Sequence, residues 1–415
     1  MIAASRPRLD FLHGVRVLLA LSVVLLHLTM AAPGVKGGGL SSILAIPLLH
    51  GYLAVPGFLV LSGFLLSVPV VLNGCQLPGG LQGFLWRRSV RIVPPYYAAY
   101  VLHLVFFVAW AWVIQRLGYG PYHSVDLELK QSYTLDNISS HLLLIHNFRG
   151  DWVVALGGVF WTIACEWQIY FLFAMVLVPL WRRVGLWAAV TLALVLGVVL
   201  TEGVVRGLWF YMIASMVPVF AFGMVAAAIV FGKGSRVRRL RGWRWGWISG
   251  CTLVAMLVVI GYLDSTVSQT ALDQGFKAAY YHLHRYLQSL LDLLFGVWRS
   301  VTIVWLTLGH LKRHTGPSSK SNQIADWVLN GLESRPARFL GQIGYSLYLN
   351  HAMIVFSMGY IACNKLPVNW IQSLFIIGGG TMASVLFASI FYLVFERPSM
   401  ARETRGMFRA KDPVT

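Results

Sequence analysis

The sequence predicts an all-α membrane protein with about ten transmembrane helices. Of its 415 residues, 57% are hydrophobic and only 12% are charged, whereas soluble domains carry roughly 25% charged residues. A soluble chain of this composition would expose larger apolar patches than monomeric proteins tolerate. Apolar runs of about 20 residues, the length that crosses the hydrocarbon core of a bilayer, recur along the whole chain.

Each apolar run is expected to be a helix, because lipid offers no hydrogen-bond partner to an unpaired backbone amide. The first run, Phe11 to Met30, is long enough to span and lacks the small-residue cleavage site of a secretory signal peptide. The longest loop, 116–153, has room for a small lid at most. The ten predicted spans are 10–31, 44–72, 95–115, 154–181, 185–202, 208–232, 244–264, 287–311, 339–361 and 372–395.

The distribution of basic residues predicts the orientation of these spans. If the N-terminus is cytoplasmic, Lys and Arg fall on the cytoplasmic side by about three to one, as the positive-inside rule requires. Both termini are then cytoplasmic, with a transmembrane domain at 1–398 and a basic tail at 399–415. The net charge of +18 is explained by topology and contact with anionic lipid and not by nucleic-acid binding. We expect a multi-pass protein of the cell (inner or plasma) membrane.

The four cysteines do not predict a disulfide framework or a metal site. They are widely scattered and have no CxxC spacing: Cys75, Cys165, Cys251 and Cys363. No metal and no permanently bound cofactor is expected.

Two ionisable residues share one face of the first predicted span. Insertion of such a side chain into a bilayer costs about 2.5–3.5 kcal/mol, so each is a candidate functional residue. Arg16 and His27 are eleven residues apart, close to three helical turns. Arg16 would lie near the inner surface and His27 in the outer half. Histidine is the side chain that exchanges a proton near neutral pH, although a structural partner for another helix is the alternative.

Further ionisable residues lie within later spans. Glu166, midway through the fourth span, must be protonated or paired, and Arg16 and His27 are the natural partners. His351 enters the ninth span, where a structural and a functional role are equally compatible with the sequence. Three others are more simply explained by structure: His103, and Asp292 with Arg299 seven residues later on one helix.

A basic segment precedes the third span. Arg87, Arg88 and Arg91 lie along a predicted interfacial helix, which we expect Pro94-Pro95 to terminate before the span begins. The planar guanidinium suits phosphate oxygens. A topological anchor that touches lipid headgroups is the alternative.

Several of these segments together resemble the acyltransferase-3 family of membrane acyltransferases. The first span resembles the family's R-x10-H pattern through Arg16 and His27. Five more motifs follow in order: Val55 to Phe64 with the Ser62-Gly63-Phe64 triplet, Arg87 to Tyr96, Trp161 through Glu166 to Tyr170, Leu340 to His351 with Tyr348, and Phe395 to Pro398. His13 and Gly344 depart from the residues usual at their positions. The resemblance is to the form without a C-terminal esterase-like domain.

The resemblance implies transfer of an acyl group, with acetyl expected, from cytoplasmic acyl-CoA to a hydroxyl of a glycan or of a glycosylated or small-molecule acceptor. His27 would be the general base or a transient acyl carrier. Arg16 would orient the site or stabilise negative charge, and Glu166 would hold one of the two. Arg87, Arg88 and Arg91 would bind the CoA phosphates; further candidates are Ser62, Trp161, Tyr348 and His351.

A transporter or flippase is the alternative from another class. In that case His27, Glu166 and His351 would form a proton relay. The ordered motifs and the lack of an evident inverted repeat favour the enzyme. Oligomeric state is not indicated by the sequence.

Overall fold

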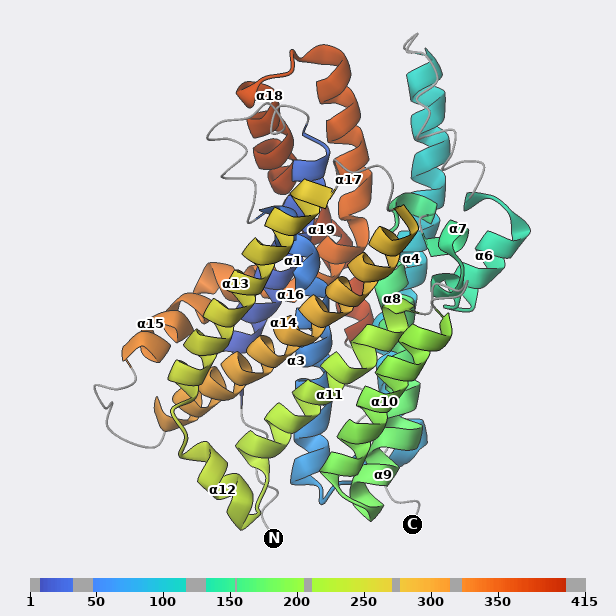
Figure 1. Ribbon diagram of the computed structural model, residues 1–415. Coiled ribbons are helices and arrows are strands. Elements are labelled where there is room, and N and C mark those ends of the chain that lie inside the picture. The colour runs from blue at the N-terminus through green and yellow to red at the C-terminus, as the bar shows by residue number, and fades with distance from the viewer. Residues whose placement is uncertain are drawn as a thin grey trace. The chain divides into compact units, whose positions relative to one another are not determined.

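The computed structural model describes residues 8–32, 48–116, 132–153, 155–204, 211–270, 277–313 and 323–400. Over these ranges every regular element is a helix (Figure 1), which confirms the predicted all-α class. The chain divides into two compact units. The first unit comprises Met1–Leu12, Val55–Pro78 and Phe171–Ser334, and the second comprises His13–Ala54, Gly79–Tyr170 and Arg335–Thr415.

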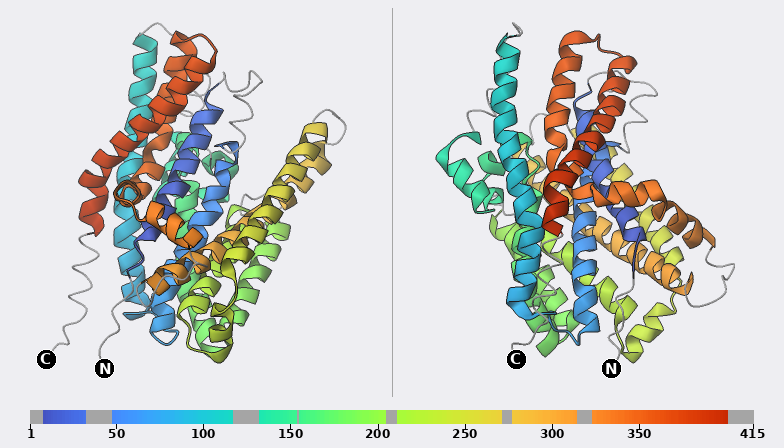
Figure 2. Two further views of the ribbon diagram at one scale, coloured as in Figure 1. Left: turned by 90° about the vertical axis from the view of Figure 1, so that its left-hand side faces the viewer. Right: turned by 180° about the vertical axis from the view of Figure 1, so that it is seen from behind.

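The first unit is built from long apolar helices that pack in series. Helix α10 packs on α11, α11 on α14, and α14 on α13 (Figures 1 and 2). The elements are α3 (Ala54–Leu72), η5 (Phe173–Leu177), α9 (Val178–Arg183), α10 (Leu186–Val204), α11 (Tyr211–Phe231), α12 (Ser235–Arg241), α13 (Trp245–Thr270), α14 (Lys277–Arg313) and α15 (Gln323–Leu332).

Glycines allow α3 and α11 to approach closely. A Cβ at Gly63 would lie 2.1 Å from the carbonyl oxygen of Phe220, and one at Gly223 would lie 2.2 Å from the carbonyl oxygen of Val60. Both distances are far too short for a side chain, so only glycine fits at either position. Small residues that bring backbones together are typical of helix contacts in membranes. Gly63 of the Ser62-Gly63-Phe64 triplet therefore has a packing role.

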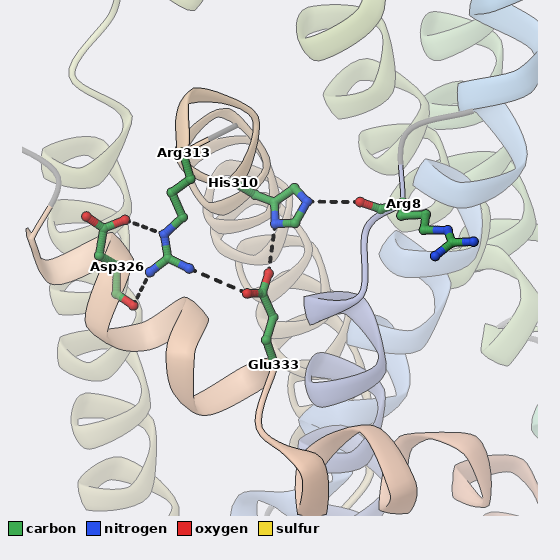
Figure 3. Close-up of polar contacts among 5 residues, drawn as sticks. All are labelled: Arg8, His310, Arg313, Asp326 and Glu333. Carbon is green, nitrogen blue, oxygen red and sulfur yellow. Dashed lines mark hydrogen bonds and ion pairs between the residues drawn. The ribbon is translucent and has the colours of Figure 1, made fainter. Parts of the chain in front are cut away.

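A partly buried ionic cluster fastens the cytoplasmic end predicted for α14 (Figure 3). Nδ1 of His310 lies 2.7 Å from a carboxylate oxygen of Glu333, and Nε2 lies 2.9 Å from the carbonyl oxygen of Arg8. Arg313 contacts a Glu333 oxygen at 3.5 Å and an Asp326 oxygen at 2.5 Å. These bonds join α14, α15 and the segment that leads into the first helix.

The second unit contains most of the motifs. Helix α17 packs against α4 and α19. The elements are α1 (Phe11–Met30), η2 (His50–Leu53), α4 (Gly80–Arg116), α6 (Leu135–Leu142), η3 (His146–Phe148), α7 (Gly150–Val153), η4 (Ala155–Gly157), α8 (Trp161–Leu172), α16 (Arg335–Gln342), α17 (Gly344–Lys365), α18 (Trp370–Leu374), η7 (Phe375–Gly379), α19 (Gly380–Phe391) and η8 (Tyr392–Glu396). Three helices, α1, α3 and α8, begin in one unit and end in the other.

Each of the ten predicted spans coincides with helix in the described ranges. Seven helices there are long and apolar enough to cross a membrane, and α11 with α12, bent by 94°, would form an eighth as a broken span. The shorter apolar helix Leu186–Leu200 and the more polar α17 coincide with the other two predicted spans. The count of ten and the cytoplasmic termini stay predictions.

The expected helix break at Pro94-Pro95 is wrong. Helix α4 continues through both prolines to Arg116, so the basic segment and the third span are one helix of 37 residues. Proline has a helix-compatible φ; its cost is the lost amide donor and a clash with the preceding turn. Tyr345 of α17 donates to the carbonyl of Ile92 at 3.1 Å, beside the carbonyls that lose their helical donors. Those carbonyls are Val90 and Arg91, four residues before each proline, whereas the Ile92 carbonyl keeps the helical N–H of Tyr96 opposite it.

The predicted lid segment folds into α6, η3 and α7, while 117–131 lies outside the described residues. It is fastened to α4 by tyrosines. Tyr96 donates to the carbonyl of His141 at 3.0 Å, and Tyr97 donates to that of Leu142 at 2.5 Å. His141 and His146 stack face to face with ring centroids 4.0 Å apart. The lid segment is thus a packed part of the second unit.

Candidate active site

Helix α1 carries Arg16 and His27, the two residues expected on one face. Close packing of the second unit holds this helix. A Cβ at Gly341 would lie 2.2 Å from the carbonyl oxygen of His13, and one at Gly344 would lie 3.3 Å from Cγ of Arg16. Gly344, which departs from the family pattern, thereby leaves room for the aliphatic part of Arg16.

Arg16 lies within electrostatic range of charged and polar groups on three other elements. It interacts electrostatically with Arg91 of α4, Glu166 and Tyr170 of α8, and Glu396 of η8. Arg16 and Glu166 are therefore near enough to interact electrostatically, and their pairing stays a prediction. The Tyr170 hydroxyl donates to a Glu166 oxygen within a single turn of α8. Two carboxylates and two guanidinium groups thus lie within electrostatic range of one another, which balances the charge of a partly buried cluster.

Glu396, in the Phe395 to Pro398 motif, is a functional candidate that the sequence alone does not reveal. Its side chain is buried, and one carboxylate oxygen accepts from the backbone N–H of Ser346 at 3.1 Å and from the Ser346 hydroxyl at 2.5 Å. Ser346 is in the first turn of α17, where backbone N–H groups have no helical acceptor. The sequence feature that could have indicated Glu396 is an acidic residue directly after the last predicted span, within the Phe395 to Pro398 motif.

His27 and His351 form a pair within the second unit. Nδ1 of His27 lies 3.1 Å from Nε2 of His351, and the ring centroids are 5.0 Å apart. Each ring also contacts a backbone carbonyl of its own helix: Val23 at 3.0 Å from His27 Nδ1, and Tyr348 at 2.8 Å from His351 Nδ1. Residues 324 positions apart are therefore in direct side-chain contact.

Two further motif residues extend this arrangement. The hydroxyl of Thr162, next to Trp161 at the start of α8, donates to the Tyr348 hydroxyl at 2.7 Å. Tyr348 in turn lies beside His351, with ring centroids 5.8 Å apart. The α8 and α17 motifs are thereby joined by a buried hydrogen bond.

The basic segment forms the early turns of α4. Arg87, Arg88 and Arg91 are all partly buried. The guanidinium of Arg87 lies over Gly79 and Gly83, where an added Cβ would come within 3.0 and 3.1 Å of its nitrogen. Gly79 has a φ of +75°, a conformation that suits glycine in the tight turn before the helix.

The remaining candidates are less directly connected. Ser62 is on α3 in the first unit, whereas the other predicted site residues belong to the second. His103 contacts the carbonyl of Ala99 and the ring of Phe160, which agrees with a structural role. The guanidinium of Arg299 lies 4.4 Å from the ring centroid of Trp298. Over the described ranges, no group of three His, Cys, Asp or Glu residues could hold a metal ion.

These features describe a helical membrane protein whose ionisable residues are suited to acid–base chemistry. The chain belongs to the acyltransferase-3 family: the family model described as an acyltransferase domain matches residues 9–393. No curated protein and no solved structure matches the chain. The protein is therefore a membrane acyltransferase, and the enzyme is favoured over the transporter alternative.

Proposed function

We propose that the protein transfers an acyl group, acetyl in the first instance, from acyl-CoA to a hydroxyl of a carbohydrate or glycosylated small-molecule acceptor. The observation that carries the proposal is the His27–His351 pair, located in a member of an acyltransferase family. Transfer to oxygen requires a base for the hydroxyl proton, and a histidine supplies one near neutral pH.

In the proposed reaction His27 acts as the general base. The acceptor hydroxyl gives its proton to His27 as its oxygen bonds to the thioester carbonyl carbon. The carbon–sulfur bond then breaks, and the departing thiolate takes the proton from His27 to give free CoA. Arg16 would either stabilise the negative charge that develops in this reaction or orient the site. Glu166 would hold Arg16 in position.

The donor is assigned to the basic start of α4. CoA carries phosphates, and Arg87 and Arg88 present guanidinium groups one turn before Arg91, which itself interacts with Arg16. The phosphates of the bound acyl-CoA would contact α4. Its thioester arm would extend along α4 and the helices packed next to it. The proposed location is the cell membrane, with acyl-CoA supplied from the cytoplasm.

Purified protein in lipid nanodiscs, labelled acetyl-CoA and a panel of carbohydrate acceptors test the proposal. His27→Ala should lower transfer by about 100-fold or more, whereas His50→Ala on η2 should retain it. Full transfer by a correctly inserted His27→Ala protein would rule out the role of His27.

The donor site is tested separately through the Michaelis constant for acyl-CoA. Arg87→Gln/Arg88→Gln should raise it about tenfold or more, since charge-assisted hydrogen bonds to phosphate are lost. Arg236→Gln/Arg239→Gln on α12, a basic helix with the same predicted sidedness, is the matched control. Equal constants for the two double variants would leave the α4 arginines as topological anchors.

A further inference from the structure

Two backbone carbonyls determine where the protons lie on the histidine pair. A carbonyl oxygen can only accept a hydrogen bond, so a ring nitrogen that contacts it must carry the hydrogen. Nδ1 of His27 contacts the Val23 carbonyl at 3.0 Å, and Nδ1 of His351 contacts the Tyr348 carbonyl at 2.8 Å. Both rings therefore carry a hydrogen on Nδ1.

The direction of the contact between the rings follows. With Nδ1 of His351 protonated, its Nε2 in the neutral ring has a lone pair and accepts. The donor is the Nδ1–H of His27 at 3.1 Å, which is shared between His351 and the Val23 carbonyl. His27 is then left with a basic Nε2, the nitrogen that can take a proton from a hydroxyl.

His351 is well placed to hold this arrangement. Its side chain is almost fully buried, at 1% exposure, so its ring has little freedom to turn. The neighbouring Tyr348 is held by the hydroxyl of Thr162 at 2.7 Å. The next residue, Ala352, packs closely on Gly157. A Cβ added at Gly157 would lie 2.9 Å from the Cβ of Ala352.

We infer that His351 is a positioning residue that fixes the tautomer and ring orientation of His27, so that Nε2 of His27 faces the reacting hydroxyl. The inference rests on the proposed function. The acceptor proton passes to Nε2 of His27 and then to the departing thiolate, while the Nδ1–H of His27 remains donated to His351. His351 neither gains nor loses a proton in the cycle, in the way that the buried third member of a catalytic triad orients its histidine.

Two substitutions separate this role from simple packing. In His351→Gln the amide oxygen can take the place of Nε2 and accept from His27. In His351→Asn the shorter amide can keep the contact with the Tyr348 carbonyl but cannot reach His27. We expect kcat to fall about 100-fold in His351→Asn and less than tenfold in His351→Gln, with KM for both substrates unchanged. Equal losses in the two variants would overturn the inference.

Nitrogen NMR of the ¹⁵N-histidine-labelled protein provides a readout that does not require turnover. Wild-type His27 should carry its hydrogen on Nδ1, and His351→Asn should shift His27 toward the Nε2 tautomer. An Nε2-protonated His27 in the wild type would refute the role of His351. Absence of acyl transfer in the wild type with the expected tautomer would instead refute the proposed function and leave the positioning role standing.

Discussion

Glu396 shows how one side chain can serve two purposes. It accepts from the N–H and the hydroxyl of Ser346, and thereby caps the N-terminal turn of α17. Its negative charge is stabilised there by the helix dipole. It also contributes an opposite charge to Arg16 and Arg91. Glu396 therefore both caps α17, the helix that carries His351, and belongs to the group of charges around Arg16.

The effect of removing Glu396 should therefore exceed that of removing its partner hydroxyl. Glu396→Ala leaves a buried helical N–H without its acceptor and should lower stability by about 1–3 kcal/mol, with loss of activity. Ser346→Ala removes only one hydrogen bond and should cost about 1 kcal/mol. Thermal unfolding in one detergent measures both. Equal melting temperatures for the two variants would contradict the capping role.

At the scale of elements, the lid segment depends on uncharged histidines. Burial lowers the pKa of His141 from 6.5 to about 4. Burial and then the nearby His141 lower the pKa of His146 well below 6.5. As pH falls from 6.5 toward 4, the undocked segment binds protons that the docked segment does not, so docking is weakened. For His141 alone the loss reaches about 3 kcal/mol.

Acid should consequently release the lid segment from α4. Hydrogen exchange, expressed as protection factors that remove the intrinsic pH effect, should show falling protection of 132–153 between pH 7 and pH 4. The double variant His141→Phe/His146→Phe keeps aromatic rings in the stack but cannot become charged, so its protection should not change. The same acid response in this variant would show that other groups control docking.

The ionic cluster at the end of α14 gives a second prediction at this scale. Glu333 receives bonds from His310 and Arg313, and its side chain is only 25% exposed. Glu333→Gln should destabilise the protein by about 2–4 kcal/mol, since it breaks a largely buried ion network. Asp151 is 49% exposed in its pair with Arg149, and Asp151→Asn should cost at most about 0.5 kcal/mol. Similar unfolding temperatures for the two variants would contradict this ranking.

At the scale of the whole molecule, the helices could be predicted because a bilayer allows few alternatives. Each of the ten apolar runs chosen from the sequence coincides with helix in the described ranges, and Arg16 and His27 both lie on α1. The expected break at Pro94-Pro95 was wrong, since α4 continues through both prolines, and contacts from other helices such as that of Tyr345 with Ile92 are not visible in a local pattern. The same reason hid the partnership of Glu396 with Ser346 and of His351 with His27, since each joins residues far apart in sequence.

The motifs are unevenly divided between the two units. All but the Ser62-Gly63-Phe64 triplet belong to the second unit, where they supply the Arg16 cluster and the histidine pair. In the first unit Gly63 of that triplet packs against α11. Motif order along the chain indicated the family, whereas the division of roles between chemistry and packing required the three-dimensional contacts.

The predicted orientation places α6 and α12 on opposite sides of the membrane. Three spans precede α6, which should therefore face the outside, and six precede α12, which should face the cytoplasm together with its arginines. Asp136 on α6 and Arg236 on α12 are both exposed. Each can be replaced by a single cysteine in a variant whose four native cysteines are serine.

A membrane-impermeant maleimide applied to intact cells then reads the orientation. Asp136→Cys should react at once, whereas Arg236→Cys should react only after the membrane is permeabilised. The opposite result would place the α12 arginines outside the cell, against the positive-inside rule. Reaction of both cysteines in intact cells would mean that an odd number of spans does not separate them, and the ten-helix topology would have to be redrawn.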